Sequence, residues 1–511
     1  MSVYRKRTGR KNININSENS LDNKITVLKN YMSNSKDIKD RRFKVGGKNV
    51  NTAILFIDNL VDEFMVQDHV IKPIMTNSFE WPQDTGPDAM LEIIKDYMLY
   101  GDIVEEVCTI EKMSLGVLDG ETLLLVEGSD KGLLINTQNL PKRSIQEPQT
   151  EPAVKGPNEG FVESFKDNLA LIRKRLKNPN LCVEITNIGK QTNNNAALIY
   201  IKGIANDRIV NEVKNKLKSV KNYDVISCEQ LMQLVCERAF SIFPLMQWTE
   251  RPDKAVSSLL EGKVGVIFDN SRGMLIAPVT LTSLMQSPDD YYEKWFIGTV
   301  ITVIRYISLL ITIFLPAVYI SITSFHPGML PTTLLISITG ARLGVPLPAF
   351  LEALIMVVTL EILQEAGIRL PKVVGQTVSI VGGLVIGQAV VQAGLISPIM
   401  VIIISLTAIA SFAIPSYSLS LASRVLRVIF MILAAVLGAF GISMGVLYLL
   451  GYLCSLKSFG IGFMEPLTPY RFKDWKDSII VLPKSLLKGR PEYLHSSSAV
   501  TKRKGCSKNG K

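Results

Sequence analysis

The 511-residue sequence is poor in the side chains that build metal centres and disulfide frameworks. It holds six cysteines and three histidines, and the cysteines are widely spread, without a CxxC pair or a histidine at ligand spacing. A disulfide framework or a zinc site is therefore not expected. We predict no metal and no cofactor.

Signatures of catalysis and nucleotide binding are also missing. Gly189-Lys190 is followed by Gln191 instead of Ser or Thr, and position 184 is Glu where a phosphate-binding loop requires glycine. No GxSxG or HExxH stretch occurs. We expect no catalytic residues and no enzyme activity.

The first thirty residues lack the apolar stretch of a signal peptide, so we expect the N-terminal half to stay in the cytoplasm. Basic clusters lie at both ends, at Arg5-Lys6-Arg7 and Lys502-Arg503-Lys504, in a chain of net charge +10. Such blocks are typical of solvated tails and also suit an anionic membrane surface. Nucleic acid is not an expected partner, because no helix-turn-helix, zinc-finger or RNP pattern accompanies the charge.

Apolar and charged residues are segregated along the chain. The mean hydropathy is +0.23 although 20% of the residues are charged. Residues 1–295 have the composition of a soluble protein, and the apolar excess lies from about Phe296 to Leu453. The fold class predicted is a multi-domain α/β N-terminal half, cytoplasmic, followed by an α-helical transmembrane bundle.

Composition and periodicity divide the chain into six parts. We predict a disordered basic arm (1–48), a first α/β domain (49–137), a proline-rich linker (138–160), a second α/β domain (161–290), a transmembrane helical domain (291–455) and a basic C-terminal tail (456–511). In the second domain, strands are predicted at Val264–Phe268 and Met274–Ala277, and Asn206 is expected to cap a helix.

Five segments are long enough to cross a hydrocarbon core of about 30 Å. They are Phe296–Thr323, Pro346–Leu363, Val373–Ile396, Ile399–Leu421 and Val425–Leu453. A shorter piece, Leu330–Gly340, suits a re-entrant or interfacial segment, so we expect four or five spans plus this segment.

Lysine and arginine bias predicts the orientation of the spans. Lys294, Arg369, Lys372, Arg424 and Arg427 all fall on one side. The fifth span would then place the basic C-terminal tail on the other side, against the bias. Either that span re-enters without crossing or the short segment crosses. The sequence leaves open whether the number of crossings is odd or even.

Charged side chains inside apolar spans are costly and mark an ion pathway or an ion pair. Arg305 lies in the first span, and Glu352, Glu361 and Glu365 lie in or at the end of the second. Glu361 and Glu365 are four residues apart and share a helix face, whereas Glu352 lies on the opposite face. One interpretation is a cavity-lining face together with an Arg305–Glu352 pair. The other is a pair that only fixes helix register, with Glu365 at the interface.

Small residues recur at four-residue spacing in two spans. They are Ser379, Gly383 and Gly387 in the third span, and Gly441 and Gly445 in the fifth. Such stripes let helix backbones approach closely, within or between subunits.

Long stretches of the chain resemble the A subunit of the GerA-type spore germinant receptors of endospore-forming bacteria. The matching stretches are Ser144–Phe161, Leu171–Leu181, Tyr200–Asn206, Trp248–Ala255, Ser287–Trp295, Thr323–Leu335, Pro346–Met356, Glu365–Lys372, Ser379–Ala389 and Thr407–Leu419. One departure from the family lies in the second predicted span, where Val357 stands at a position that is often acidic in the family.

The resemblance implies a multi-pass subunit of a nutrient receptor in the spore inner membrane. It also implies two partners, a transporter-like B subunit and a lipoprotein C subunit, and assembly into a homo-oligomer that releases cations. A homologue associated with the dipicolinate channel shares many of the same stretches.

We therefore favour an oligomeric, ligand-gated cation-conducting subunit. A non-conducting scaffold for the receptor complex has the same fold. A secondary transporter would require internally repeated membrane halves, which the sequence does not display.

Overall fold

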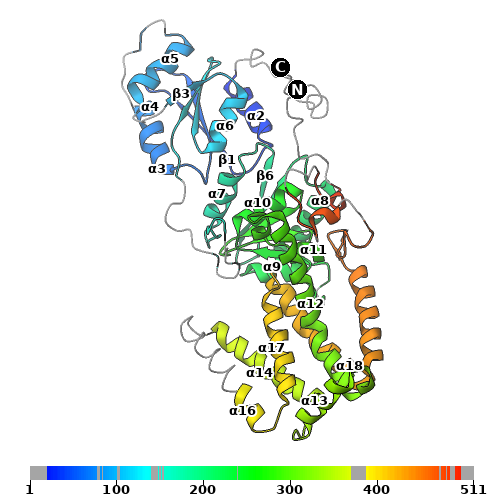
Figure 1. The fold of residues 1–511 in the computed structure, drawn as a ribbon. Helices are drawn as coiled ribbons and strands as arrows, with labels where there is room; N and C mark the ends of the chain where they lie inside the picture. The colour runs from blue at the N-terminus through cyan, green and yellow to red at the C-terminus, as the bar shows by residue number, and fades with distance from the viewer. Residues whose placement is uncertain are drawn as a thin grey trace, which may run out of the picture.

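The computed structural model arranges the chain as two α/β domains in a row, followed by a bundle of long helices (Figure 1). It describes residues 20–495 except 77–80, 83–84, 100–103, 140–147, 149–150, 152–154, 239, 370–386, 471–473, 479 and 484–488.

The first α/β domain contains a five-stranded antiparallel sheet in the order β1-β2-β4-β5-β3. Its strands are β1 (Ile38–Lys44), β2 (Asn51–Ile57), β3 (Val104–Val107), β4 (Thr122–Val126) and β5 (Gly132–Ile135). Its helices are α2 (Leu21–Tyr31), α3 (Glu63–Met65), η1 (Val66–Ile71), α4 (Lys72–Thr76), α5 (Pro87–Ile93), η2 (Ile94–Met98) and α6 (Ile110–Asp119). Every residue of β4 is buried because helices cover both faces of the sheet.

The predicted disordered arm is wrong for the described residues 20–48. Helix α2 is capped by Ser20, and β1 pairs with β2 along its whole length from Ile38 to Lys44. Strand β1 is an edge strand with the sequence IKDRRFK, and only Ile38 and Phe43 are buried in it. Its charged, solvent-facing side chains hide the strand from a hydrophobicity pattern.

The second α/β domain has a sheet of matching order, β6-β7-β9-β10-β8, and every pairing in it is antiparallel. Its strands are β6 (Leu181–Ile188), β7 (Asn194–Ile201), β8 (Gln247–Thr249), β9 (Val264–Phe268) and β10 (Met274–Ala277). Its helices are α7 (Phe165–Arg175), α8 (Asp207–Ser219), η3 (Val220–Asn222), α9 (Cys228–Val235), α10 (Pro252–Glu261) and α11 (Leu281–Met285). The predicted bounds of β9 and β10 are confirmed, as is Asn206, whose side chain accepts the Arg208 N–H at 3.0 Å.

The two α/β domains are tandem copies of one topology. Strands β9 and β10 begin 142 residues after β4 and β5, at Val264 against Thr122 and at Met274 against Gly132. Helices α6 and α10 both end at a left-handed glycine, Gly120 (φ 92°) and Gly262 (φ 109°). A non-glycine residue rarely adopts this conformation, so both copies use glycine as the cap.

A buried ion pair fastens the two copies to each other. Arg173 of α7 donates from Nε to Asp37 Oδ2 at 2.8 Å and from Nη2 to Asp37 Oδ1 at 3.0 Å. Its Nη2 also donates to Ser35 Oγ at 2.9 Å. The Arg173 and Asp37 side chains are 2% and 1% exposed, so the pair belongs to the interior of the molecule.

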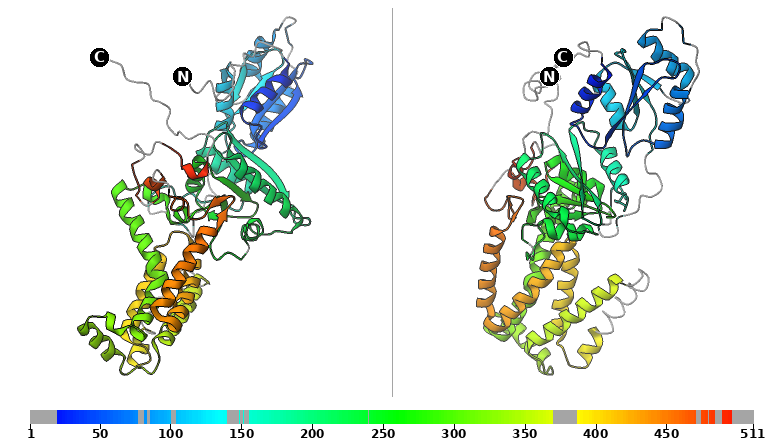
Figure 2. Two further views of the ribbon diagram at one scale, coloured as in Figure 1. Left: turned by 90° about the vertical axis from the view of Figure 1, so that its right-hand side faces the viewer. Right: turned by 180° about the vertical axis from the view of Figure 1, so that it is seen from behind.

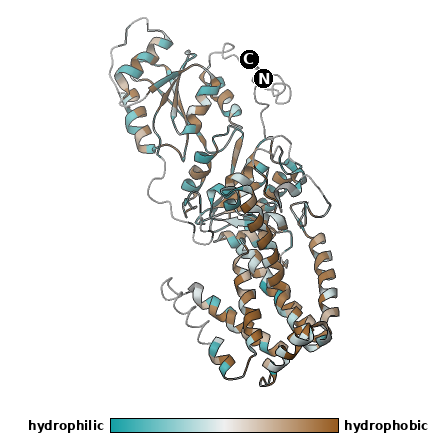
Figure 3. Cartoon of the chain, in the orientation of Figure 1, coloured by the Kyte–Doolittle hydropathy of each residue, from teal (hydrophilic) through white to brown (hydrophobic). Residues whose placement is uncertain are grey.

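The helical half begins with η4 (Pro288–Tyr291) and α12 (Trp295–Ser324). It continues through η5 (Pro327–Met329), α13 (Thr332–Arg342), α14 (Ala349–Arg369), α16 (Gly387–Gln392), α17 (Pro398–Phe412) and α18 (Tyr417–Ser455). Helices α12 and α18 are long and apolar enough to cross a membrane, with mean hydropathies of 2.1 and 2.5. Figure 3 shows mostly apolar residues along these helices, in contrast to the mixed colouring of the α/β domains.

Helix boundaries differ from prediction at the last two predicted spans. The chain breaks after Phe412, and Arg424 and Arg427 lie inside α18 instead of in a connecting loop. Within α18, Gly438 has φ 61° and ψ −140°, which bends the 39-residue element into two arms. Most of the predicted third span, residues 373–386, lies outside the described residues.

The second arm of α18 returns the chain to the second α/β domain. It leads into β11 (Lys457–Ser458) and β12 (Ile461–Gly462), followed by η7 (Asp474–Asp477) and η8 (Glu492–Leu494). Four side chains after α18 are buried in the core of the second domain, namely Phe459, Ile461, Tyr493 and Leu494. The described part of the predicted tail is therefore packed structure.

The predicted linker contacts the second domain at the residues that the structure describes. Glu151 Oε1 accepts a hydrogen bond from Lys254 Nζ at 2.6 Å, and Glu159 accepts one from Lys174 Nζ at 3.1 Å. The middle and the C-terminal end of the linker are thus held by ion pairs.

Candidate functional site

Arg305 lies where the second α/β domain meets the helical bundle. Its Nη1 donates to Asp290 Oδ2 of η4 at 2.5 Å and to the Met285 carbonyl at 3.4 Å. The predicted Arg305–Glu352 pair is therefore wrong. Because Asp290 precedes α12 and its side chain is 1% exposed, the charge of Arg305 is compensated at the border between the two halves.

Glu352 is buried at the opposite end of the bundle, near the start of α14. Its Oε1 accepts from Arg342 Nη2 of α13 at 3.2 Å, and its Oε2 accepts from the Ser397 N–H at 3.0 Å. Ser397 caps α17, so the carboxylate also lies at the positive end of that helix. Glu352 is 0% exposed and joins α13, α14 and α17.

Glu361 lies about two and a half turns farther along α14 and faces α18. Its Oε1 accepts from Arg427 Nη2 at 2.5 Å, and its Oε2 accepts from Arg424 Nη1 at 3.1 Å. Arg427 is 1% exposed, so its guanidinium group depends on Glu361 for compensation. One carboxylate thus faces two guanidinium groups, and the cluster carries one excess positive charge.

Glu365 is exposed on α14, one turn beyond Glu361. It ends a row of exposed side chains whose spacing alternates between four and three residues. The row consists of Leu351 (39% exposed), Ile355 (46%), Val358 (49%), Ile362 (63%) and Glu365. We call it the α14 stripe. Spacing of this kind is typical of a helix that packs along another helix.

The predicted packing glycines have different surroundings. An ideal Cβ on Gly441 would lie 2.3 Å from the Leu433 carbonyl oxygen, and one on Gly445 would lie 2.7 Å from the Phe430 ring. Both glycines therefore occupy the contact between the two arms of α18. At Gly387, nothing in the described chain lies within 4 Å of such a Cβ, and Ser379 and Gly383 lie outside the described residues.

Asp289 and Asp290 of η4 contact both halves of the molecule, and the sequence did not predict this. Asp289 accepts from Arg251 Nη1 of the second α/β domain at 3.2 Å, while Asp290 accepts from Arg305 of α12. Arg251 is 2% exposed and also binds Asp253 Oδ2 at 2.8 Å. Helix η4 is thereby held to the α/β domain on one side and to α12 on the other. Two consecutive carboxylates shortly before an apolar span were the sequence feature that could have indicated this contact.

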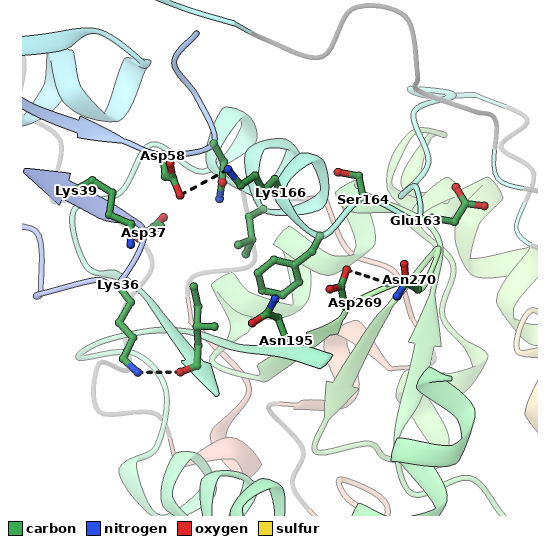
Figure 4. Close-up of a pocket in the computed structure, with 14 residues that line it drawn as sticks. Lys36, Asp37, Lys39, Asp58, Glu163, Ser164, Lys166, Asn195, Asp269 and Asn270 are labelled. Carbon is green, nitrogen blue, oxygen red and sulfur yellow. Dashed lines mark hydrogen bonds and ion pairs between the residues drawn. The ribbon is translucent and has the colours of Figure 1, made fainter. Parts of the chain in front are cut away.

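A cavity of about 530 Å³ lies between the two α/β domains (Figure 4). Lysines and carboxylates from both domains line it, and Lys166 forms an ion pair with Asp58 across it at 3.9 Å. Glu163, at its rim, pairs with Arg272 at 3.3 Å. The cavity is therefore part of the domain interface. In the described chain, no group of three or more His, Cys, Asp or Glu side chains is placed to hold a metal ion.

Comparison with known proteins decides the family. The family described as Bacillus/Clostridium GerA spore germination protein matches residues 26–493. The chain belongs to the GerA spore germination family. This GerA-family chain is 40% identical to spore germination protein B1 of Bacillus subtilis over 474 residues, which is 93% of this chain and 97% of that protein.

A second curated relative agrees with this assignment. The GerA-family chain is 40% identical to spore germination protein KA of Bacillus subtilis over 482 residues, covering 94% of this chain and 88% of that protein. Among solved structures, the N-terminal domain of the A subunit of the Bacillus megaterium spore germinant receptor GerK3 is 29% identical. It has a TM-score of 0.39 and covers 51% of this chain and 95% of that domain. The family is thus that of germinant receptor A subunits, which act in spore germination.

Proposed function

We propose that this chain is the membrane-embedded A subunit of a nutrient receptor, and that several copies form a ligand-gated cation path. Its location would be the spore inner membrane, with the α/β domains in the cytoplasm. By resemblance to the family, its partners would be a transporter-like B subunit and a lipoprotein C subunit.

A multi-pass topology with both ends on one side is supported by the two ends of the helical half. Helix α12 begins beside η4, and α18 leads into β11, where Ser458 Oγ donates to the Leu245 carbonyl of the second domain at 2.7 Å. Both ends therefore meet the same α/β domain. An even number of crossings follows, and the basic C-terminal residues would then lie on the cytoplasmic side.

The α14 stripe is the observation that best supports a conduction path. Figure 1 shows α14 slanting away from α12 and α17 toward its C-terminal end. If several copies meet along this stripe, Ile355, Val358 and Ile362 form an apolar constriction. The Glu365 carboxylates then form a ring at the end of α14 nearer the α/β domains. Carboxylate rings favour cations, and apolar constrictions gate by losing water.

The pairing of the other two glutamates assigns them a different part in this proposal. Glu352 and Glu361 are both bound to arginines within the chain. They would hold α14 to its neighbours, while Glu365, which is exposed at the end of the α14 stripe, would be the carboxylate that ions meet. The same pairing favours the second candidate, a non-conducting scaffold, because it leaves fewer acidic groups for a path.

The Asp289–Asp290 contact supports coupling between the domains and the path. Arg251 and Arg305 both bind η4, a short connection in which Asp290 is buried. A rotation of the second α/β domain would therefore act on α12. Binding in one part of a receptor can change a path only through such a physical connection.

Cation flux from liposomes that contain the purified receptor complex tests the proposal. With a rich nutrient medium as trigger, the unchanged receptor should release potassium, and Glu365→Gln should slow release about tenfold or more because the ring loses its charge. Glu365→Asp keeps the charge and serves as the matched control. Release that is equally fast in Glu365→Gln removes Glu365 from the path. No release from any variant favours the scaffold.

A further inference from the structure

A fully exposed phenylalanine lies on the second α/β domain. Phe240 is 101% exposed in the loop that follows α9, whereas Phe243, three residues later, is 5% exposed and belongs to the core shared with the helical bundle. A single exposed apolar side chain is common on proteins and by itself indicates no partner. The position of this loop relative to the helical bundle is the second observation.

The loop is bound to the last turn of α18. Arg238 Nη1 donates to Ser455 Oγ at 3.5 Å, and Tyr452 and Ser241 share a hydrogen bond at 3.4 Å. The Phe243 ring packs against that of Tyr452, with 6.3 Å between ring centroids. Phe240 lies between Arg238 and Ser241, so it is at the level of the end of this helix.

The length of the second arm of α18 indicates where the end of this helix, and with it Phe240, lies relative to a membrane. The arm from Gly438 to Ser455 has a rise of about 27 Å at 1.5 Å per residue. This is close to the hydrocarbon thickness of about 30 Å. With Gly438 at one edge of the hydrocarbon core, Ser455 and the bound loop lie at the headgroup level on the other.

Two further exposed aromatic side chains lie at the same end of the bundle. Trp295 begins α12 and is 51% exposed, and Tyr417 begins α18 and is 55% exposed. Figure 2 shows the starts of these helices beside the second α/β domain in both views. Aromatic residues at helix ends are typical of the membrane–water boundary.

We propose that Phe240 is a membrane-surface anchor of the second α/β domain, inserted at the boundary between lipid headgroups and acyl chains. The proposal rests on the membrane assignment made above for α12 and α18. Arg238, two residues before Phe240, is held by Ser455 of α18. Phe240 and Ile242, which is 40% exposed, are the exposed apolar groups of this loop.

Photo-cross-linking of the full chain in its native membrane tests the anchor. p-Benzoylphenylalanine at position 240 should form lipid adducts on irradiation. The same residue at position 64 is the matched control, because Phe64 is 68% exposed on α3 of the first α/β domain, which lies beyond the second domain from the bundle (Figure 1). We expect lipid adducts at 240 at least tenfold above those at 64.

Protein adducts at 240, to a second copy or another subunit, would overturn the anchor and identify a protein interface. Adduct yields as low as those at 64 would also overturn it. Alkaline extraction of the same membranes separates this failure from a failure of the membrane assignment. A chain that stays in the pellet keeps its spanning helices, whereas an extracted chain contradicts the assignment itself.

Discussion

Replacing Asp37 by alanine removes the carboxylate that compensates a buried guanidinium group between the two α/β domains. Arg173 would keep its bonds to Ser35 Oγ and to the Leu181 carbonyl, but it would lose both bonds to Asp37 and its only carboxylate partner in that network. Removing one member of a buried ion pair costs about 3–5 kcal/mol, because the remaining charge stays in a medium that solvates it poorly.

A second ion pair across the same interface provides the control. Lys177 Nζ lies 2.7 Å from Asp119 Oδ1, and the two side chains are 52% and 43% exposed. Exposed pairs contribute about 0–1 kcal/mol, since water and salt screen them. Asp119→Ala should therefore change stability by less than about 1 kcal/mol.

Urea unfolding of the detergent-solubilised full chain, followed by circular dichroism, measures the difference. Asp37→Ala should lower the free energy of unfolding of the α/β domains by about 3 kcal/mol or more. The double variant Asp37→Ala with Arg173→Leu should regain much of this loss, because no charge is left buried. A loss in Asp37→Ala no larger than that in Asp119→Ala would refute the reasoning.

Three further predictions concern the bend of α18, the α14–α18 contact and a carboxyl pair. Gly438→Ala should lower the thermal midpoint in detergent, since a positive φ costs alanine about 1–3 kcal/mol and its Cβ would lie 3.0 Å from Phe325. Gly451→Ala is the control and should leave the thermal midpoint unchanged, because nothing lies within 4 Å of a Cβ at this helical position. Equal thermal midpoints of the two variants would contradict the bend. Glu361→Gln should lower the thermal midpoint more than Glu365→Gln, because two arginines lose their counter-charge; the reverse order would contradict the pairing. Burial and the neighbouring Glu237 carboxyl raise the pKa of Glu212 from 4.5 to about 7. The folded chain therefore keeps a proton that the unfolded chain loses between these values, and stability falls as pH rises through this window. Glu212→Gln should flatten that fall and stabilise the chain at pH 8 by about 1 kcal/mol; an unchanged pH profile would contradict it.

The elements that the sequence predicted well are those whose pattern is local. Strands β9 and β10 are apolar runs around a polar turn, and their bounds match the prediction. Helix α12 follows from length and hydropathy alone, whereas α18 begins at Tyr417, eight residues before the predicted span. Strand β1 escaped prediction because its charged residues face solvent at a sheet edge, and only its pairing with β2 reveals it. The repeat of the same elements 142 residues farther along the chain was the sequence feature that could have indicated this strand.

The ion pairs of the helical half were beyond local patterns. Arg305 could be placed in a span, but its partner Asp290 comes from the preceding connection and not from another span. Likewise, the arginines that bind Glu361 lie on α18, more than sixty residues away along the chain. The bend at Gly438 was hidden because a glycine within an apolar run is also common in straight membrane helices.

The copy number of the purified chain tests the central claim most directly. A path lined by the α14 stripe exists only where several copies meet, so native mass spectrometry of the detergent-solubilised chain should detect a closed homo-oligomer. Ile362→Glu, which places a charge among the apolar residues of the stripe, should dissociate it. A strict monomer at every concentration would contradict the conduction account and leave the scaffold.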